Sequence, residues 1–182
     1  MPAAATRGCT VWFTGLPCSG KSTLARMTFE KLSGLGLPVE ILDGDEIRKH
    51  FSAGVGFSKE ERSAHLRRVS YLCQMLTKHG VIVIAAFISP YRENRAYARG
   101  LIGDRFVEIF TDSSVEVCVK RDIKGMYKRA IAGEIKQFTG ISDPYERPER
   151  PELVLKTAAE TAEQSLAKLM NLLRDRYGIR VS

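Results

Sequence analysis

A phosphate-binding motif stands near the start of the chain. Residues 15–22 read GLPCSGKS, which fits the pattern GxxxxGK[ST] in full. Glycines in such a loop let backbone N–H groups turn toward a phosphate, and the following helix N-terminus adds favourable partial charge. Lys21 is expected to reach the β- and γ-phosphates of a nucleoside triphosphate, and the Ser22 hydroxyl to bind Mg²⁺. A tight glycine turn with a chance lysine is the alternative, and the strand and helix predicted on either side disfavour it.

Two carboxylates follow the next predicted strand. Asp43 and Asp45, in the string LDGD, lie where that strand ends. In open α/β sheets the carboxyl ends of parallel strands face the ligand crevice. Carboxylates placed there, beside a phosphate-binding loop, can hold Mg²⁺ or accept a proton from a substrate hydroxyl. An ordinary Asp-Gly turn is the alternative.

A group of arginines indicates an anionic acceptor. Guanidinium groups match the planar oxygens of phosphate or sulfate, and Arg48, Arg62, Arg67 and Arg68 follow the carboxylates. Arg67 and Arg68, taken singly, are more typical of a solvated surface.

Two aromatic residues and one serine have more than one interpretation. Phe57 and Phe138 lie outside the predicted helices and strands, where they either cap the core or stack a base, and spacing alone favours the core. Ser89 and Pro90 follow the most apolar predicted strand, again at the ligand edge. From its position alone, Ser89 is expected to cap the following helix.

The elements that position these residues alternate along the chain. Ser58 with Glu61, and Ser113 with Glu116, have capping-box spacing and predict helix starts. Apolar runs predict strands at 9–14, 39–42, 81–87, 106–110 and 153–155, and helical periodicity falls at 21–35, 58–79, 90–102, from 113 onward, and 161–177. This alternation predicts a parallel sheet covered on both faces, within one domain over residues 1–182. Residues 123–151 are rich in charge, Gly and Pro and predict a long excursion, typical of a lid, with a disordered insertion as the alternative.

Composition narrows the partners and the compartment. The chain has 28 Lys and Arg against 21 Asp and Glu, a net charge of +7, which favours anionic ligands. We expect no nucleic-acid partner, because no known nucleic-acid module is present, and no membrane-spanning helix, because no long apolar run occurs. The four cysteines are widely spaced and form no CxxC pair, so neither a disulfide framework nor a zinc site is expected. Together with an N-terminus unlike a secretory signal, this favours the cytoplasm.

From about residue 8 to residue 173 the chain resembles one family, the adenylylsulfate kinases. The strings that carry the resemblance are GLPCSGKST, LDGDEIR, GFSKEERSAHLRRV, AFISPYRENR, KGMYKRAIAGEIKQFTGI and DPYERPERPEL. The family transfers the γ-phosphoryl of ATP to the 3′-hydroxyl of adenosine 5′-phosphosulfate (APS), giving PAPS and ADP. The resemblance implies a three-layer α/β/α fold with a five-stranded parallel P-loop kinase sheet and a lid at about 122–151. It also implies ATP and Mg²⁺ as cofactors, a homodimer, and a separate ATP sulfurylase as a functional partner.

The resemblance also implies roles for individual residues. Asp43, more than Asp45, would orient or deprotonate the attacking hydroxyl, and Phe57 and Phe138 would sandwich the adenine of APS. Ser89 matches a serine once assigned as a phosphoserine intermediate, although in-line transfer needs none. His65 stands where asparagine is usual in the family. The implied catalytic residues are Lys21, Asp43, Asp45 and Ser89; the ATP-binding residues are Gly15, Ser19, Gly20, Lys21, Ser22, Thr23 and Arg121; the metal ligands are Ser22 and Asp43; the APS-binding residues are Arg48, Phe57, Arg62, His65, Ile88, Ser89, Pro90, Lys124, Phe138 and Gly140.

Three other functions compete with this interpretation. Another small-molecule kinase of the same fold would act on shikimate, a sugar acid or a nucleoside monophosphate, but a base sandwich would serve no purpose for a non-aromatic acceptor. A nucleotide-dependent switch would bind ATP without acceptor-dependent release of ADP. A nucleic-acid-binding protein would show steeply salt-dependent binding to DNA. A GTPase is disfavoured because no guanine-reading NKxD segment is found.

Overall fold

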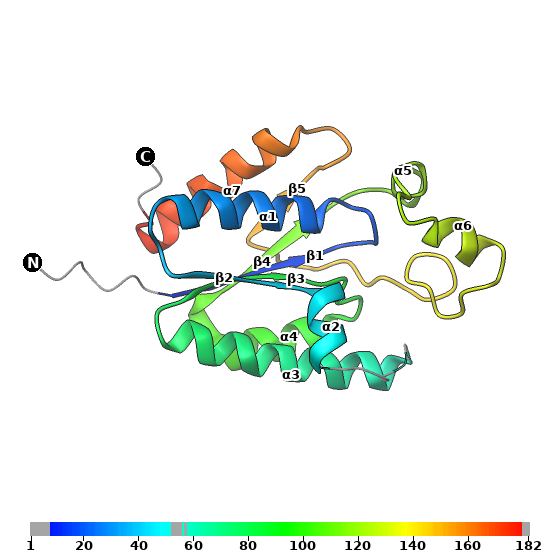
Figure 1. Cartoon of the computed structure of the whole chain (residues 1–182), viewed down its shortest axis with the longest axis horizontal. Helices are drawn as coiled ribbons and strands as arrows, with labels where there is room; N and C mark the ends of the chain where they lie inside the picture. The colour runs from blue at the N-terminus through cyan, green and yellow to red at the C-terminus, as the bar shows by residue number, and fades with distance from the viewer. Residues whose placement is uncertain (1–7, 52–55, 57, 180–182) are drawn as a thin grey trace, which may run out of the picture.

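The computed structural model describes residues 8–51, 56 and 58–179. Its centre is a five-stranded parallel sheet in the order β2-β3-β1-β4-β5 (Figure 1). The strands are β1 (Thr10–Thr14), β2 (Val39–Asp43), β3 (Ile82–Ala86), β4 (Phe106–Thr111) and β5 (Leu153–Leu155). Each lies within a residue or two of the position expected from its apolar run, so the predicted α/β fold with a parallel sheet is confirmed.

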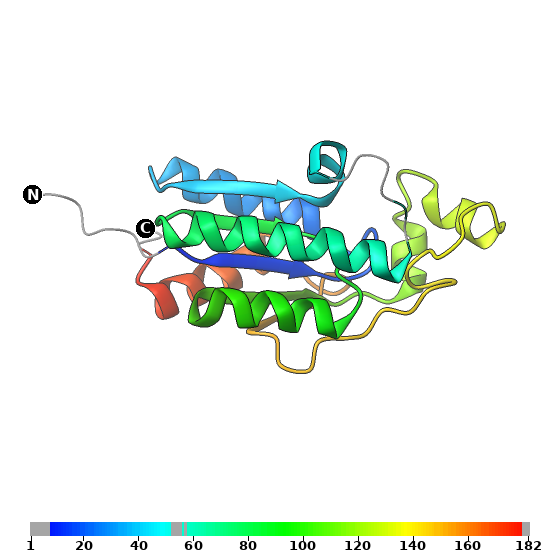
Figure 2. The ribbon, with the colours of Figure 1, turned by 90° about the horizontal axis from the view of Figure 1, so that it is seen from below.

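Helices cover both faces of the sheet. They are α1 (Lys21–Gly34), α2 (Gly44–Phe51), α3 (Lys59–Lys78), α4 (Arg92–Ile102), α5 (Val115–Lys120), α6 (Met126–Ile131) and α7 (Ala162–Tyr177), with a 3₁₀ turn at Gly103–Arg105. Helices α1 and α7 lie on one face, and α3 and α4 on the other (Figures 1 and 2). Strands β1 and β3 are buried throughout, which explains their continuous apolar sequence. Side chains that alternate along β1 enter opposite cores: Val11 and Phe13 pack toward α1 and α7, and Trp12 toward α3 and α4.

The residues that cap the helices differ in part from those expected. Ser58 and Glu61 form the predicted capping box of α3. The cap expected at Ser113 is wrong, because Ser114 accepts the hydrogen bond from the Val117 backbone and opens α5. The cap expected at Ser89 is also wrong. Helix α4 begins at Arg92, after Tyr91, and the Ser89 hydroxyl is engaged elsewhere.

Residues 112–152 leave the sheet after β4 and return to it at β5, and we call this segment the 112–152 excursion. Its helices α5 and α6 lie beyond the carboxyl ends of the strands, at the right of Figure 1, and its later residues run back toward β5. It has its own apolar cluster, formed by Leu16, Cys118, Tyr127, Ala130 and Phe138. At its base Arg147 forms an ion pair with Asp112 at 2.9 Å. The excursion is therefore a folded unit packed on the phosphate-binding loop, not the disordered insertion considered as an alternative.

Within the described part of the chain, no helix is both long enough and apolar enough to cross a lipid bilayer.

Candidate functional site

The phosphate-binding loop connects β1 to α1, as its sequence predicts. Gly20 caps α1 in a left-handed conformation, with φ of 99°, and Lys21 is the first helical residue. The Lys21 ammonium donates hydrogen bonds to the carbonyl oxygens of Gly15 (2.9 Å) and Leu16 (2.6 Å). Burial lowers the pKa of Lys21 to about 8. The loop thus holds a buried ammonium against two backbone carbonyls beside a helix N-terminus, a position that favours phosphate.

The Ser22 hydroxyl and the Asp43 carboxylate meet at the mouth of this loop. Ser22 donates a 2.7 Å hydrogen bond to Asp43 Oδ2, although the two residues are 21 positions apart. The other oxygen of Asp43 accepts from the Asp45 backbone N–H at 3.0 Å. A hydroxyl and a carboxylate form the oxygen-only donor set that suits Mg²⁺, which usually keeps several waters as further ligands. Among the described residues no cluster of three or more His, Cys, Asp or Glu is arranged to hold a metal by itself.

The excursion also contacts the second carboxylate of the site, that of Asp45. Lys124 forms an ion pair with Asp45, and both side chains are largely exposed. This contact raises the pKa of Lys124. The proposed catalytic and lid residues are therefore brought together across the open side of the site. Exposed ion pairs of this kind contribute less than about 1 kcal/mol, so the bridge can form and break readily.

Ser89 is held in a left-handed conformation at the end of β3. Its φ is 40°, and it is almost fully buried. The Ser89 hydroxyl accepts from Trp12 Nε1 at 3.1 Å and donates to Thr14 Oγ1 at 3.0 Å, while Thr14 donates to the Ile88 carbonyl at 2.8 Å. Because the hydroxyl of Ser89 is committed to protein groups, its geometry suits a structural role better than that of a phosphoryl acceptor. Residues 88–90 nevertheless lie at the carboxyl edge of the sheet, where the sequence placed them.

Three residues expected to bind the anionic acceptor come from α2 and α3. Arg62 is buried, donates a 2.7 Å hydrogen bond to Thr139 and a second bond to the Gln137 carbonyl, and so ties α3 to the excursion. Arg48 donates to the Gly56 carbonyl. His65 packs on the Phe87 ring, with centroids 5.9 Å apart, and burial lowers its pKa to about 4. The histidine is therefore neutral at physiological pH, and its ring can both donate and accept a hydrogen bond.

Phe138 and Gly140 lie in the excursion, against the phosphate-binding loop. Phe138 is buried and packs edge-on against Tyr127, with ring centroids 4.9 Å apart. The other half of the expected base sandwich, Phe57, lies outside the described residues. A cleft of about 590 Å³ opens beside this packing, between residues 140–147 and the end of β4, with Leu16 in its wall.

Sequence reasoning missed Thr157, and it placed Tyr127 in the lid without indicating its contact with the phosphate-binding loop. Thr157 follows β5, accepts from Arg121 through its carbonyl, and donates a 2.8 Å hydrogen bond to the Ser19 carbonyl. It therefore links Arg121, expected at the ATP adenine, to the phosphate-binding loop. The Tyr127 hydroxyl donates to the Pro17 carbonyl at 3.1 Å. Both side chains satisfy carbonyls of the loop, a demand that no local sequence pattern signals. Thr23 is exposed on the first turn of α1.

The parallel sheet, the loop between β1 and α1, the buried lysine and the serine–aspartate pair define a P-loop kinase fold. The comparisons with known proteins are more specific. The family model described as adenylylsulphate kinase matches residues 7–156. The chain belongs to the adenylylsulphate kinase family, and it is a kinase.

Individual relatives agree with the family model. The adenylyl-sulfate kinase of Synechococcus sp. (strain JA-3-3Ab) is 51% identical over 168 residues, covering 92% of this chain and 95% of that protein. The Mycobacterium tuberculosis APS kinase CysC, solved in complex with AMPPNP and APS, superposes with a TM-score of 0.88 at 42% identity, covering 92% of this chain and 98% of that chain. A hexameric APS kinase from Thiobacillus denitrificans gives a TM-score of 0.72 at 31% identity, covering 97% of this chain and 30% of that one.

Proposed function

We propose that this protein transfers the γ-phosphoryl of ATP to the 3′-hydroxyl of APS, forming PAPS and ADP for sulfate assimilation. The observation that carries the proposal is the meeting of Lys21, Ser22 and Asp43 at the carboxyl edge of the sheet, in a chain of this family. The M. tuberculosis relative was solved with both an ATP analogue and APS, which supports the same ligands here.

The proposed chemistry divides among a few side chains. Mg²⁺ bound by Ser22 and Asp43 would offset charge on the phosphates. Lys21 and the loop amides bind the transferring phosphoryl. The Asp43 carboxylate also orients the acceptor hydroxyl in line with that phosphoryl. Asp45 is proposed as a second catalytic carboxylate, and its ion pair with Lys124 brings the lid to the same edge of the site. Because phosphoryl transfer depends mainly on positioning and electrostatics, this set needs no covalent enzyme intermediate at Ser89.

The remaining residues are proposed to bind the two nucleotides. Gly15, Ser19, Gly20 and Thr23 would contact the ATP phosphates, with Arg121 over the adenine. The APS-binding set is Arg48, Phe57, Arg62, His65, Ile88, Ser89, Pro90, Lys124, Phe138 and Gly140. Residues 122–151 would act as a lid that closes over the nucleotides and excludes water, which otherwise competes as acceptor. The contacts of Arg62 and Lys124 across the site support this closure.

The cellular setting is proposed on the same basis. We propose one domain over residues 1–182, a homodimer, a cytoplasmic location, and supply of APS by a separate ATP sulfurylase. Assembly of relatives into oligomers has a precedent in the hexameric T. denitrificans protein. Light scattering of the purified protein measures the assembly directly, and a mass other than that of a dimer would contradict that part.

The decisive experiment is ADP release from Mg-ATP with APS, AMP, shikimate and gluconate as acceptors at equal concentration. Selective stimulation by APS is the expected result. Stimulation by another acceptor would discard the APS site while leaving the kinase fold in place. ATP binding without acceptor-dependent ADP release would favour a nucleotide switch instead.

A further inference from the structure

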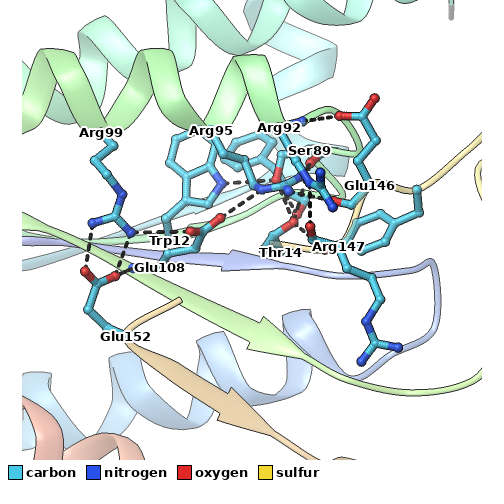
Figure 3. Close-up of polar contacts among 12 residues, drawn as sticks. Trp12, Thr14, Ser89, Arg92, Arg95, Arg99, Glu108, Glu146, Arg147 and Glu152 are labelled. Carbon is cyan, nitrogen blue, oxygen red and sulfur yellow. Dashed lines mark hydrogen bonds and ion pairs between the residues drawn. The ribbon is translucent and has the colours of Figure 1, made fainter. Parts of the chain in front are cut away.

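A buried arginine on α4 connects the acceptor edge of the sheet to the excursion. Arg95 is 3% exposed and forms an ion pair with Glu108 of β4, with Nε donating to Oε1 at 2.8 Å (Figure 3). One terminal nitrogen of its guanidinium donates to the Ser89 carbonyl at 2.5 Å. The other donates to the Glu146 carbonyl at 2.6 Å. Each of the three nitrogens therefore binds a different segment of the chain.

This arrangement depends on the shape of the guanidinium group. Its planar fork holds several acceptors at fixed angles, whereas a lysine ammonium is a point charge on a flexible stem. Glu108 supplies the negative charge that makes burial of Arg95 tolerable. Arg95 can then donate from both terminal nitrogens to backbone carbonyls of two separate segments of the chain.

The two carbonyls belong to segments with proposed roles in catalysis. Ser89 lies in the acceptor-lining loop at residues 88–90, and its left-handed conformation is one that non-glycine residues keep only when surrounding contacts hold it. Glu146 lies where the proposed lid returns toward the sheet. The same segments also meet directly, because the Glu146 N–H donates to the Pro90 carbonyl at 2.8 Å.

We propose that Arg95 is a positioning residue for the acceptor. It holds the backbone of residues 88–90 in a fixed position relative to the returning limb of the lid. Arg95 therefore sets the affinity for the acceptor nucleotide and not for ATP. The inference rests on the proposed function, because it takes residues 88–90 as part of the acceptor site. Arg95 acts through the backbone of Ser89 and does not itself touch the reacting atoms.

The chain contains an internal reporter of this loop. Trp12 is its only tryptophan, and the indole both donates to the Ser89 hydroxyl at 3.1 Å and stacks on Phe87 with ring centroids 5.5 Å apart. A shift of Ser89 changes the hydrogen bond of the indole, and therefore its emission. Trp12 fluorescence thus reads the position of Ser89 without any turnover.

Arg99 is the matched control, one turn further along α4. It shares Glu108 as a partner at 3.3 Å and pairs with Glu152 at 2.7 Å, so it belongs to the same charge network, although its side chain is 36% exposed (Figure 3). Among the described residues it contacts Glu108, Glu152 and the Phe106 ring, all away from residues 88–90. Replacing either arginine by lysine keeps the charge but removes the fork.

The experiment compares Arg95→Lys and Arg99→Lys with the wild-type protein, using initial rates of ADP release with APS and ATP varied separately. We expect Arg95→Lys to raise the KM for APS at least tenfold, to leave the KM for ATP within twofold, and to shift Trp12 emission in the free protein. Arg99→Lys should leave both KM values unchanged, even where its urea midpoint falls. Equal rises of both KM values, or no change in either, would overturn the proposal.

A second variant keeps the test decisive if Arg95→Lys does not fold. Glu108→Gln retains Arg95 and the shape of its partner but removes the charge that orients the guanidinium, so a smaller rise in the KM for APS alone is expected. An unchanged KM for APS in a folded Glu108→Gln protein would count against the proposal. Failure of the wild-type protein to use APS would instead refute the proposed function, and Trp12 emission would still decide whether Arg95 holds Ser89.

Discussion

Gly140→Ala tests how closely the excursion must approach the phosphate-binding loop. Gly140 has φ of +91°, and a Cβ added there would lie 2.8 Å from Leu16 Cδ2. The left-handed backbone alone costs an L-residue about 1–2 kcal/mol. The close contact adds about 1–3 kcal/mol, the usual cost of overpacking, because Leu16 is itself buried and must shift. The expected loss of unfolding free energy is therefore about 2–5 kcal/mol.

Gly125→Ala separates the two contributions. Gly125 also has a left-handed φ of +64°, but an added Cβ there meets nothing within 4 Å. This variant should lose only the backbone part. The gap between the two variants isolates the Leu16 contact at about 1–3 kcal/mol, or roughly 2–12 °C in Tm for a chain of this size.

Urea and thermal unfolding measure the difference in unfolding free energy between the two variants, and ADP release measures its effect on catalysis. The Gly140→Ala protein should also show a raised KM for ATP, because Leu16 belongs to the loop that binds the phosphates. A Leu16→Ala change in the Gly140→Ala background should cost less than Leu16→Ala alone. Equal unfolding free energies for Gly140→Ala and Gly125→Ala would refute the reasoning.

Three further predictions concern charge at the site. Lys21→Ala should lower kcat by about 10²–10³-fold or more with an unchanged circular dichroism spectrum, and near-normal turnover would remove Lys21 from the proposed mechanism. Asp43→Asn should raise the Mg²⁺ concentration needed for half-maximal ADP release, since Ser22 would lose its charged partner, and an unchanged Mg²⁺ titration would exclude Asp43 as a ligand. His65 has a folded pKa of about 4, below its ordinary value near 6.5, so the unfolded chain binds more protons in this range. Stability should therefore fall as the pH drops from about 6.5 to 4, and His65→Gln should flatten that part of the urea-midpoint profile; an identical slope in both proteins would contradict the burial of a neutral imidazole.

The sheet and its ligand edge were predictable because both depend on local sequence. Buried parallel strands need continuous apolar runs, and the run at 81–87 falls on β3. Gly20 and Lys21 stand at the helix start because the motif itself specifies that turn. The capping box at Ser58 was equally local, since both partners lie within one turn.

What the sequence left open depends on long-range partners. Ser89 looked like a helix cap, but Trp12 and Thr14, more than 70 residues away, hold its hydroxyl instead. Helix α2 was not expected, because Asp43-Gly44-Asp45 also fits a turn and the helix spans only eight residues. Phe138 packs on Tyr127. Its spacing in the sequence favoured a core position over base stacking but did not indicate this partner.

The ion pair between Asp112 and Arg147 divides the excursion into a stem and a head. Asp112 directly follows β4, and Arg147 lies on the returning limb, so their 2.9 Å contact marks where the two limbs come together near the sheet. β4 and β5 are themselves neighbouring strands, which keeps the stem narrow. Because β4 and β5 pair directly, changes in the head do not alter the register of the sheet. Residues added at the exposed tip around Gly133 and Glu134 would lengthen the head without moving either strand, so this is the part of the chain where length and sequence can change while the kinase core stays fixed.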